Sequence, residues 1–302
     1  MTDAAPTVER KRFIDPSLHR ITQYSSVRNF VDADAIPAGY NVIHEGGLPI
    51  DIQVNDRGHD ATIVSLHGAV TPDHRLPYMA GQAVTREVAA NRIFISDASL
   101  MLDPKLNLAW FAGSARLRLQ LALPAIIKRI VADRPEVKRL IFFGSSGGGF
   151  ASLFYASRFP GSIAVVSNPQ TAIGRYIPAA VENYVRVAFD GTSNNPISRL
   201  PFDVVDDVVP IYAHAVDVTV LYAQNSTDAM HVTGHARPFF ESLHPDNRAW
   251  WYASSAWGAG HVAPPKEVFT EMLHAAVATD VGSAAEAMGF QRARGVDDLR
   301  LK

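Results

Sequence analysis

The residues best suited to chemistry lie in the run Gly144-Ser145-Ser146-Gly147-Gly148. Ser146 has glycines two positions before and two positions after it, whereas Phe143 stands where Ser145 would need a glycine. A G-x-S-x-G turn between a strand and a helix is tight enough to present the serine hydroxyl clear of the backbone. The run therefore predicts a serine nucleophile at position 146.

The flanking residues predict the strand and the helix that such a turn needs. Residues 140–143 are wholly apolar, as in a strand buried on both faces of a parallel sheet. Phe150, Leu153 and Phe154 follow at helical spacing, and Pro160 ends the pattern. The amino end of this helix would point at Ser146, where its unpaired amides favour negative charge.

Other interpretations of this glycine-rich run remain. A plain glycine-rich turn is the structural alternative. A phosphate-binding P-loop needs lysine after its last glycine, but Phe150 follows Gly149. A dinucleotide-binding turn needs an acidic residue about 20 positions later, and none lies between Glu136 and Glu182. Both phosphate-binding interpretations are therefore disfavoured.

A serine hydroxyl needs a base to take its proton and a third group to orient that base. The predicted strand 216–223 runs into Asp228, and the predicted strand 248–253 runs into Gly260-His261. The order serine, acid, histidine is typical of enzymes with this turn. Asp228 could instead cap a following helix, and His261 could be an ordinary hydrogen-bonded loop residue.

A metal site is the other chemistry to weigh. His231 and His235 are four residues apart, as two zinc ligands on a helix can be. However, Val232 stands where a zinc protease motif has glutamate, and Gly234 weakens a helix there. We therefore expect neither a metal nor a cofactor.

In combination these motifs resemble the α/β-hydrolase superfamily over about residues 41–280. The resemblance rests on the serine turn, on His67-Gly68 at a strand end, on the Asp228 loop and on the loop Gly258-Ala259-Gly260-His261. It implies an α/β fold with a mostly parallel central sheet, an antiparallel start and helices on both faces. His67 itself is expected to be a structural hydrogen-bonding residue that shapes its loop.

The resemblance also implies roles for individual residues. Ser146 would be the nucleophile, His261 the general base and then acid, and Asp228 the acid that orients it. The backbone amides of Gly147 and Ala69 would form the oxyanion hole.

The activity implied is that of a serine hydrolase, which cleaves a carboxylic ester, a thioester or an amide through an acyl-enzyme. Trp257 and Tyr176 are candidates to line the binding site for a small-molecule ester or acyl substrate. An acyltransferase using the same three residues and a non-catalytic binding scaffold of the same fold are the alternatives.

The predicted elements give the domain organisation. Residues 1–38 are expected to form an N-terminal extension, 39–280 the α/β-hydrolase domain and 281–302 a C-terminal tail. Residues 171–200 are an irregular insertion that would serve as a small lid or as a surface excursion. A long helical pattern covers residues 110–132, which include Pro124, and a hairpin covers residues 41–54.

Composition narrows the function classes. The 302 residues are 47% hydrophobic and 19% charged with a formal net charge of −2, which gives no broad attraction to nucleic acid or to anionic membranes. There is no cysteine, so disulfides and thiolate sites are excluded. Residues 1–20 lack the apolar core of a signal peptide, and no stretch reaches the ~20 apolar residues of a membrane span. We expect a cytoplasmic protein, with its oligomeric state left open.

Overall fold

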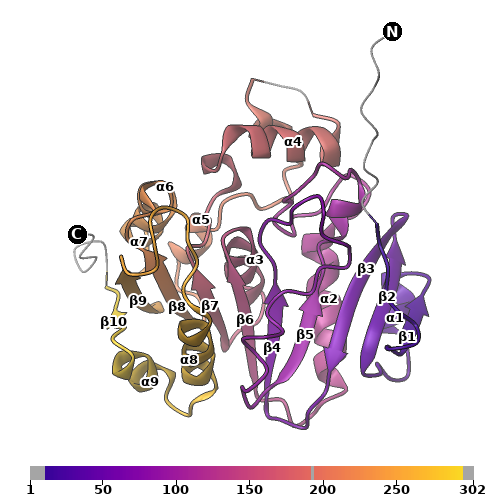
Figure 1. Cartoon of the computed structure of the whole chain (residues 1–302), viewed down its shortest axis with the longest axis horizontal. Coiled ribbons are helices and arrows are strands. Elements are labelled where there is room, and N and C mark those ends of the chain that lie inside the picture. Colours follow the sequence, from indigo (N-terminus) through magenta and orange to yellow (C-terminus); the bar gives the residue numbers. More distant parts are fainter. Residues whose placement is uncertain (1–10, 192–193, 295–302) are drawn as a thin grey trace.

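The computed structural model describes residues 11–191 and 194–294. Within them, ten strands form one sheet in the order β1-β2-β3-β5-β4-β6-β7-β8-β9-β10 (Figure 1). The strands are β1 (Ile21–Tyr24), β2 (Gly39–Glu45), β3 (Leu48–Asn55), β4 (Ala61–Leu66), β5 (Asn91–Ile95), β6 (Arg139–Ser145), β7 (Ser162–Ser167), β8 (Val218–Asn225), β9 (Arg248–Ser254) and β10 (Gln291–Arg292).

The central sheet is mostly parallel. Strands β5, β4, β6, β7, β8 and β9 run in the same direction. The β2–β3 hairpin is antiparallel, and β3 pairs antiparallel with β5. The expected mostly parallel sheet with an antiparallel start is therefore confirmed. Loops after the parallel strands meet at one edge of the sheet, which is where open α/β sheets place their ligands.

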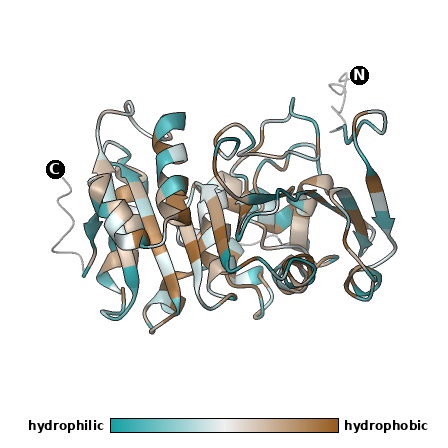
Figure 2. Cartoon of the chain, turned by 90° about the horizontal axis from the view of Figure 1, so that it is seen from below, coloured by the Kyte–Doolittle hydropathy of each residue, from teal (hydrophilic) through white to brown (hydrophobic). Residues whose placement is uncertain are grey.

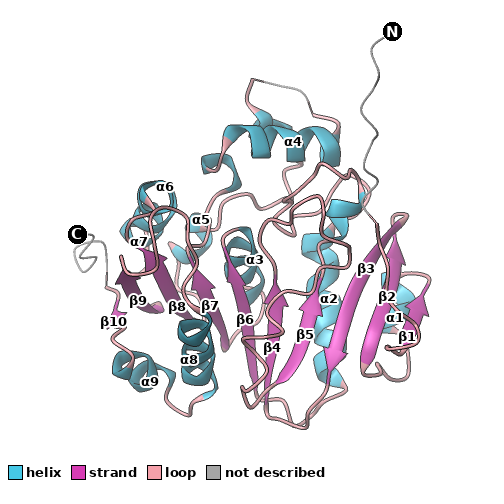
Figure 3. Ribbon diagram, viewed as in Figure 1, coloured by secondary structure: helices cyan, strands magenta, loops and turns pink. Residues whose placement is uncertain are grey.

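Helices cover both faces of the sheet (Figure 3). The α-helices are α1 (Val27–Val31), α2 (Leu119–Ala132), α3 (Gly147–Ala156), α4 (Pro178–Phe189), α5 (Val209–Tyr212), α6 (Ala229–His231), α7 (Arg237–Glu241), α8 (Lys266–Val277) and α9 (Val281–Ala287). Shorter helical segments are η1 (Ala98–Met101), η2 (Ile173–Arg175), η3 (Pro196–Arg199) and the π-helical η4 (Val232–Ala236). Among the described residues, no helix is both long enough and apolar enough to span a bilayer.

Alternation along the strands explains this two-sided packing. Val64 and Phe142 belong to the core cluster that includes residues of α2 and α3. Their neighbours Ile63 and Ile141 belong to the opposite cluster, which includes Phe269 of α8. Successive side chains of a strand point to opposite faces, so wholly apolar strands require cover on both sides. Figure 2 shows hydrophobic colour along the central strands accordingly.

Segments near both ends of the chain pair with the central sheet and bury side chains, which the sequence does not predict. Within the expected extension 1–38, β1 pairs in parallel with β2 and Phe30 of α1 is fully buried. Within the expected tail 281–302, α9 buries Ala285, and β10 pairs with β9. Residues 1–10 and 295–302 lie outside the described residues. Few and widely spaced apolar residues in these segments gave no periodic signal, yet each contributes to the core.

The helix expected over residues 110–132 begins only at Leu119. Trp110 and Phe111 both have φ of 54°, a left-handed conformation that a helix cannot include. The amide of Phe111 donates to Asp97 Oδ2 at 2.7 Å. Helical spacing upstream of Leu119 thus reflects burial of a loop, while Pro124 is accommodated within α2.

The insertion at residues 171–200 contains η2, α4 and η3, and residues 192–193 lie outside the described part of the chain. Helix α4 lies beyond the carboxyl ends of the parallel strands (Figure 3). Tyr184 of α4 is fully buried and donates to the carbonyl of Gly113 at 2.9 Å. The insertion is therefore attached to the loop that precedes α2.

Asp97, directly after β5, is a buried carboxylate that holds this loop. It is 1% exposed and accepts from the amides of Ser99 (3.0 Å) and Phe111 (2.7 Å). Burial raises the pKa of Asp97 to about 6, although these amides partly offset the effect. The folded protein therefore prefers the protonated carboxyl more than the unfolded chain does.

This preference predicts how stability changes with pH. Because the folded pKa of about 6 exceeds the ordinary aspartate pKa of 3.8, the contribution is fully present below pH 3.8 and is lost as pH rises through 6. Relative to Asp97→Asn, the native protein should lose on the order of 3 kcal/mol of unfolding free energy between pH 4 and pH 7. Denaturant unfolding of both proteins across this range measures it. A stability difference independent of pH would contradict the prediction.

Candidate active site

The turn around Ser146 is a strained connection between β6 and α3. Ser146 has φ of 55° and ψ of −120°, which a residue with a side chain rarely adopts. Its amide donates to the carbonyl of Ser167 at 3.0 Å. Its own carbonyl accepts from the amides of Gly149 (3.0 Å) and Gln170 (3.1 Å). These bonds on both sides of the peptide hold Ser146 in its conformation.

Glycines are required here by close approach of backbones. A Cβ at Gly148 would overlap the carbonyl oxygen of Leu66, at the end of β4. A Cβ at Gly144 would overlap the carbonyl of Gly148 one turn later. The start of α3 can therefore press against the end of β4 only because these two positions lack side chains.

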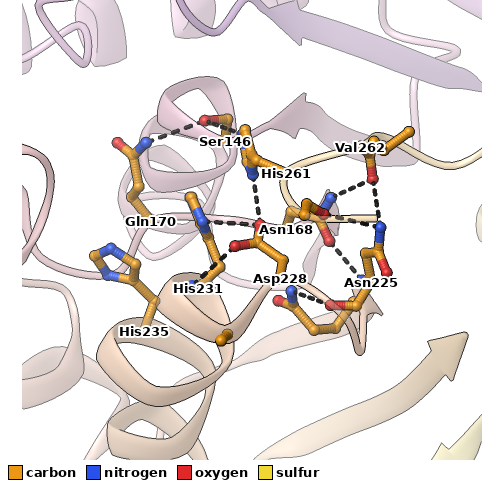
Figure 4. Close-up of polar contacts among 12 residues, drawn as sticks. Ser146, Asn168, Gln170, Asn225, Asp228, His231, His235, His261 and Val262 are labelled. Atoms are coloured by element: carbon orange, nitrogen blue, oxygen red, sulfur yellow. Dashed lines mark hydrogen bonds and ion pairs between the residues drawn. The ribbon is translucent and has the colours of Figure 1, made fainter. Parts of the chain in front are cut away.

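Three side chains from distant parts of the sequence meet at this turn. His261 Nε2 lies 3.1 Å from Ser146 Oγ, and His261 Nδ1 lies 2.6 Å from Asp228 Oδ2 (Figure 4). Ser146 is half-buried, Asp228 is 4% exposed, and the His261 side chain is 39% exposed. The structure thus brings together the hydroxyl, imidazole and carboxylate that the sequence predicts to act together.

Two buried asparagines hold the loop that carries His261. Asn168 Nδ2 donates to the carbonyl of Val262 at 2.9 Å, and its Oδ1 accepts from the amide of Asn225 at 2.6 Å. Asn225 Nδ2 in turn donates to the carbonyls of Gly258 (2.9 Å) and Gly260 (3.0 Å). Both asparagines are fully buried. The loop is therefore held through its backbone in addition to the contact of the His261 side chain with Asp228 (Figure 4).

Asp228 contacts a second imidazole. His231 Nδ1 lies 2.9 Å from Asp228 Oδ2, the same oxygen that His261 approaches. The rings of His231 and His261 are stacked, with centroids 4.0 Å apart and planes 13° apart. Asp228 Oδ1 also accepts from the backbone amide of His231 at 3.2 Å, so Asp228 caps α6 as well. The helix-cap alternative and the contact with His261 are both present.

The charges in this cluster follow from burial and pairing. Burial alone would raise the pKa of Asp228, but its contacts with His231 and His261 outweigh burial and hold that pKa well below its usual range. Burial lowers the pKa of His231, although Asp228 partly opposes the shift. Burial and the neighbouring His231 lower the pKa of His235 to about 3. At neutral pH the site therefore holds an ionised Asp228 beside uncharged His231 and His235.

Asp228, His231 and His261 are also the residues whose spacing has to be compared with that of metal ligands. Asp228, His231 and His261 have potential ligand atoms within 4.8 Å of one another. Ligand atoms around a tetrahedral zinc ion lie about 3.3 Å apart, given bonds of about 2.0–2.1 Å. The two imidazole nitrogens approach Asp228 Oδ2 more closely, at 2.6 and 2.9 Å. The fit is better for two imidazoles sharing one carboxylate oxygen than for a metal.

The loop after β4 lies against the serine turn. A Cβ on Gly68 would lie 3.6 Å from Ser146 Cβ and 3.9 Å from the amide nitrogen of Gly147. His67 Nε2 accepts from the amide of Asp97 at 3.0 Å, which leaves Nδ1 to donate to the carbonyl of Gly68 at 2.7 Å. The expected structural role of His67 is confirmed. Ala69 follows directly and is exposed at the edge of a cavity.

This cavity, of about 510 Å³, is mostly apolar and lies between the β4 loop and the insertion that contains α4. Leu108, one of its lining residues, packs where a side chain on Gly147 would lie. Tyr176, another, has its ring 6.0 Å from that of His231. The cavity is lined by Ala69, Lys105, Leu106, Asn107, Leu108, Tyr176, Ile177, Ala179, Ala180 and Asn183. The cavity therefore adjoins the site in two places, at Gly147 through Leu108 and at His231 through Tyr176.

The two aromatic candidates have different positions. Tyr176 lines the cavity. Trp257 instead packs against the core cluster on the α8 face, with its ring 6.0 Å from Tyr252. Trp257 is thus not among the residues that line this cavity.

Sequence reasoning missed one side chain that contacts Ser146. Gln170 Nε2 donates to Ser146 Oγ at 3.0 Å, and Gln170 is fully buried (Figure 4). Its position three residues after β7, in the loop at the carboxyl edge of the sheet, was the available signal. Asn168 shares that loop, whereas the spacing of His231 and His235 in the sequence indicates only metal ligation.

No protein-family model and no curated protein matches the sequence. Solved structures do resemble it. A mutant of the capsule O-acetyltransferase of Neisseria meningitidis serogroup A, in complex with CoA, superposes with a TM-score of 0.54 at 13% identity over 80% of this chain and 94% of that one. The Pyrococcus horikoshii acylaminoacyl peptidase superposes with a TM-score of 0.51 at 13% identity over 71% of this chain and 36% of that one.

The chain has the α/β-hydrolase fold. At this level of identity the likeness concerns the arrangement of the elements, so any activity must be argued from the site itself. Within the α/β-hydrolase fold, the turn at Ser146 occupies the position known as the nucleophile elbow, between a central strand and the helix that follows it.

The elbow gives a direct stability prediction. Gly148→Ala should destabilise the protein by more than about 3 kcal/mol, or prevent folding, because the added methyl group overlaps backbone atoms of β4 that cannot move aside. Gly234→Ala is the matched control, since its Cβ would meet only the carbonyl of Arg175 at 3.9 Å. Chemical denaturation compares the two. Equal stability of both variants would show that the elbow is not tightly packed.

Proposed function

We propose that this protein is a serine hydrolase that cleaves a carboxylic ester, a thioester or an amide through an acyl-enzyme on Ser146. The observation that carries the proposal is the continuous contact from Ser146 Oγ to His261 (3.1 Å) and from His261 to Asp228 (2.6 Å). Each distance is within reach of proton transfer or of a charge-assisted hydrogen bond.

The chemistry follows from these contacts. His261 Nε2 takes the hydroxyl proton as Ser146 Oγ attacks the substrate carbonyl, and the ionised Asp228 stabilises the imidazolium that results. His261 then returns the proton to the leaving group. Water then attacks the acyl-enzyme in the same way, with His261 taking its proton and passing it to Ser146 Oγ, and the carboxylic acid is released. The uncharged state of His231 favours the step, because a second cation stacked on His261 would oppose formation of the imidazolium.

The negative charge that develops on the substrate oxygen needs donors. Gly147 is the first residue of α3, so its amide has no carbonyl one turn earlier to accept its hydrogen. We assign it, with the amide of Ala69, to the oxyanion hole. In serine hydrolases the loss of one such donor costs roughly 10²–10³ in rate.

The cavity beside Ser146 suggests the kind of group that binds. Its walls are formed mainly by aliphatic side chains and by Tyr176, which suits an apolar acyl group. We further propose that the insertion at 171–200 acts as a lid over this cavity, because Tyr176 and residues of α4 form one of its walls.

Covalent labelling tests the assignment of the nucleophile. A fluorophosphonate probe should label the native protein, and Ser146→Ala should abolish labelling because the attacking oxygen is removed. Ser145→Ala is the matched control: Ser145 Oγ donates to the carbonyl of Ser167 at 3.0 Å and takes no part in the contacts with His261. Intact-protein mass spectrometry reads out the adduct.

The outcomes of this experiment separate the alternatives. Labelling that survives Ser146→Ala would defeat the assignment. A folded native protein that never reacts would favour the non-catalytic binding scaffold of the same fold.

Acyl transfer is the second candidate, favoured by the structural likeness to a capsule O-acetyltransferase solved in complex with CoA. Such an enzyme uses the same acyl-enzyme but passes the acyl group to an alcohol or amine. In this protein Ser146 is half-buried and the His261 side chain is 39% exposed, so water can reach the acyl-enzyme.

We therefore expect hydrolysis to dominate. With an activated ester as donor and an excess of alcohol or amine acceptor, the free acid should remain the main product by chromatography. The same assay with an acyl-CoA donor tests whether CoA is accepted as the leaving group. Transfer product in excess of acid would assign the protein to the acyltransferases instead.

A further inference from the structure

Gln170 and Trp110 form a buried pair behind the nucleophile. Gln170 Nε2 donates to Ser146 Oγ at 3.0 Å. Gln170 Oε1 accepts from the indole Nε1 of Trp110. Gln170 is fully buried and Trp110 is 1% exposed. The pair comes from two separate loops, one after β7 and one before α2.

Trp110 fixes the orientation of the Gln170 side-chain amide. An indole nitrogen is only a donor, so it can be paired only with the oxygen of the Gln170 amide. The NH₂ group of that amide must then face Ser146, and Ser146 Oγ accepts a hydrogen bond from it. The hydroxyl hydrogen of Ser146 is left to its other partner, His261 Nε2, at 3.1 Å. That is the direction in which the proton must leave.

We propose that Gln170 is a further catalytic residue, held by Trp110 as a positioning residue, and that it directs the Ser146 hydroxyl toward His261 and stabilises charge on Ser146 Oγ. This rests on the proposed acyl-enzyme mechanism. During acylation, the Oγ–H proton moves to His261 Nε2 as the Oγ–carbon bond forms and the carbonyl electron pair moves onto its oxygen. That electron pair then re-forms the carbonyl as the bond to the leaving group breaks, and His261 gives the proton to the leaving group. During deacylation, water bonds to the acyl carbon and loses a proton to His261, the carbon–Oγ bond breaks with its electron pair going to Oγ, and His261 gives this proton to Oγ.

Gln170 assists both steps in the same way. Oγ gains negative charge as its proton leaves in the first step and as the carbon–Oγ bond breaks in the second, and the Gln170 N–H already points at it from a buried position. A hydrogen bond to a charged group is stronger than one to a neutral group. Donors that are in place before the charge appears need no reorganisation.

A purely structural role for the side chain is the alternative. The backbone amide of Gln170 already donates to the carbonyl of Ser146 at 3.1 Å, so the loop keeps this link when the side chain is changed. Substitutions that keep the length of the side chain therefore separate the two roles.

The test uses Gln170→Glu and Gln170→Met, with the fluorophosphonate reaction rate as the readout. An ionised carboxylate would accept the Ser146 hydrogen and divert it from His261, and methionine offers no donor. Both variants should react at least about tenfold more slowly than the native protein near pH 8, as expected for loss of a hydrogen bond to a charged group. Gln120→Glu is the matched control, because Gln120 is a buried glutamine that bonds both backbone groups of Val205.

The pH dependence distinguishes catalysis from packing. As pH falls, the carboxyl introduced by Gln170→Glu becomes protonated and can donate to Ser146 Oγ as the amide does. The rate of this variant relative to the native protein should therefore rise toward acid pH, while that of Gln170→Met stays low. Gln170→Met has no titratable group at this position and serves as the reference for the pH profile. Trp110→Phe should cause a smaller loss of rate, because the side-chain amide of Gln170 can then also adopt the orientation that places its oxygen toward Ser146.

Three results would overturn the proposal: reaction of Gln170→Met at the native rate, a Gln170→Glu deficit that does not change with pH, or an equal loss in Gln120→Glu. If Gln170→Glu fails to fold, as judged by circular dichroism, the Gln170→Met rate decides. These failures differ from failure of the proposed function, in which the native protein does not react or Ser146→Ala still does.

Discussion

The backbone of Ser146, held at φ of 55° between β6 and α3, is the constraint on which the site depends. A conformation of this kind costs of the order of 1–3 kcal/mol and persists only when its surroundings fix it. Here Gly148 lets α3 approach the end of β4, and Ser167 accepts from the Ser146 amide. One turn thereby directs Oγ toward His261 and Gln170, and places Gly147 at the helix terminus.

Burial then sets the charges around this turn. Asp228 stays ionised because two imidazoles contact one of its oxygens, and His231 stays uncharged because it lies out of water. His261, more exposed than either, is the member of the stacked pair that faces Ser146. General-base chemistry needs one ionised carboxylate beside the imidazole that accepts the proton, and Asp228 provides it here. The loop carbonyls held by Asn168 and Asn225 keep that geometry without adding charge.

Local patterns in the sequence suffice for the elbow, for the strands that are wholly apolar, and for the order of Asp228 and His261 at later strand ends. What they do not reveal depends on contacts between distant segments. The edge strand β1 and helix α1 bury few side chains, so their sequences show no periodic pattern of hydrophobic residues, although Phe30 reaches the core. The loop at Trp110 has helical spacing, yet a bond from Phe111 to the buried Asp97 turns it away from helix. The role of Gln170 depends on its contact with Trp110, which fixes the end of the amide that faces Ser146.

A crystal structure of the protein after reaction with a fluorophosphonate tests the central claim most directly, because it shows the covalent bond and its surroundings together. We expect phosphorus bonded to Ser146 Oγ, the phosphoryl oxygen within about 3 Å of the amides of Gly147 and Ala69, and His261 still paired with Asp228. An adduct on another residue, or a phosphoryl oxygen that points away from both amides, would contradict the account.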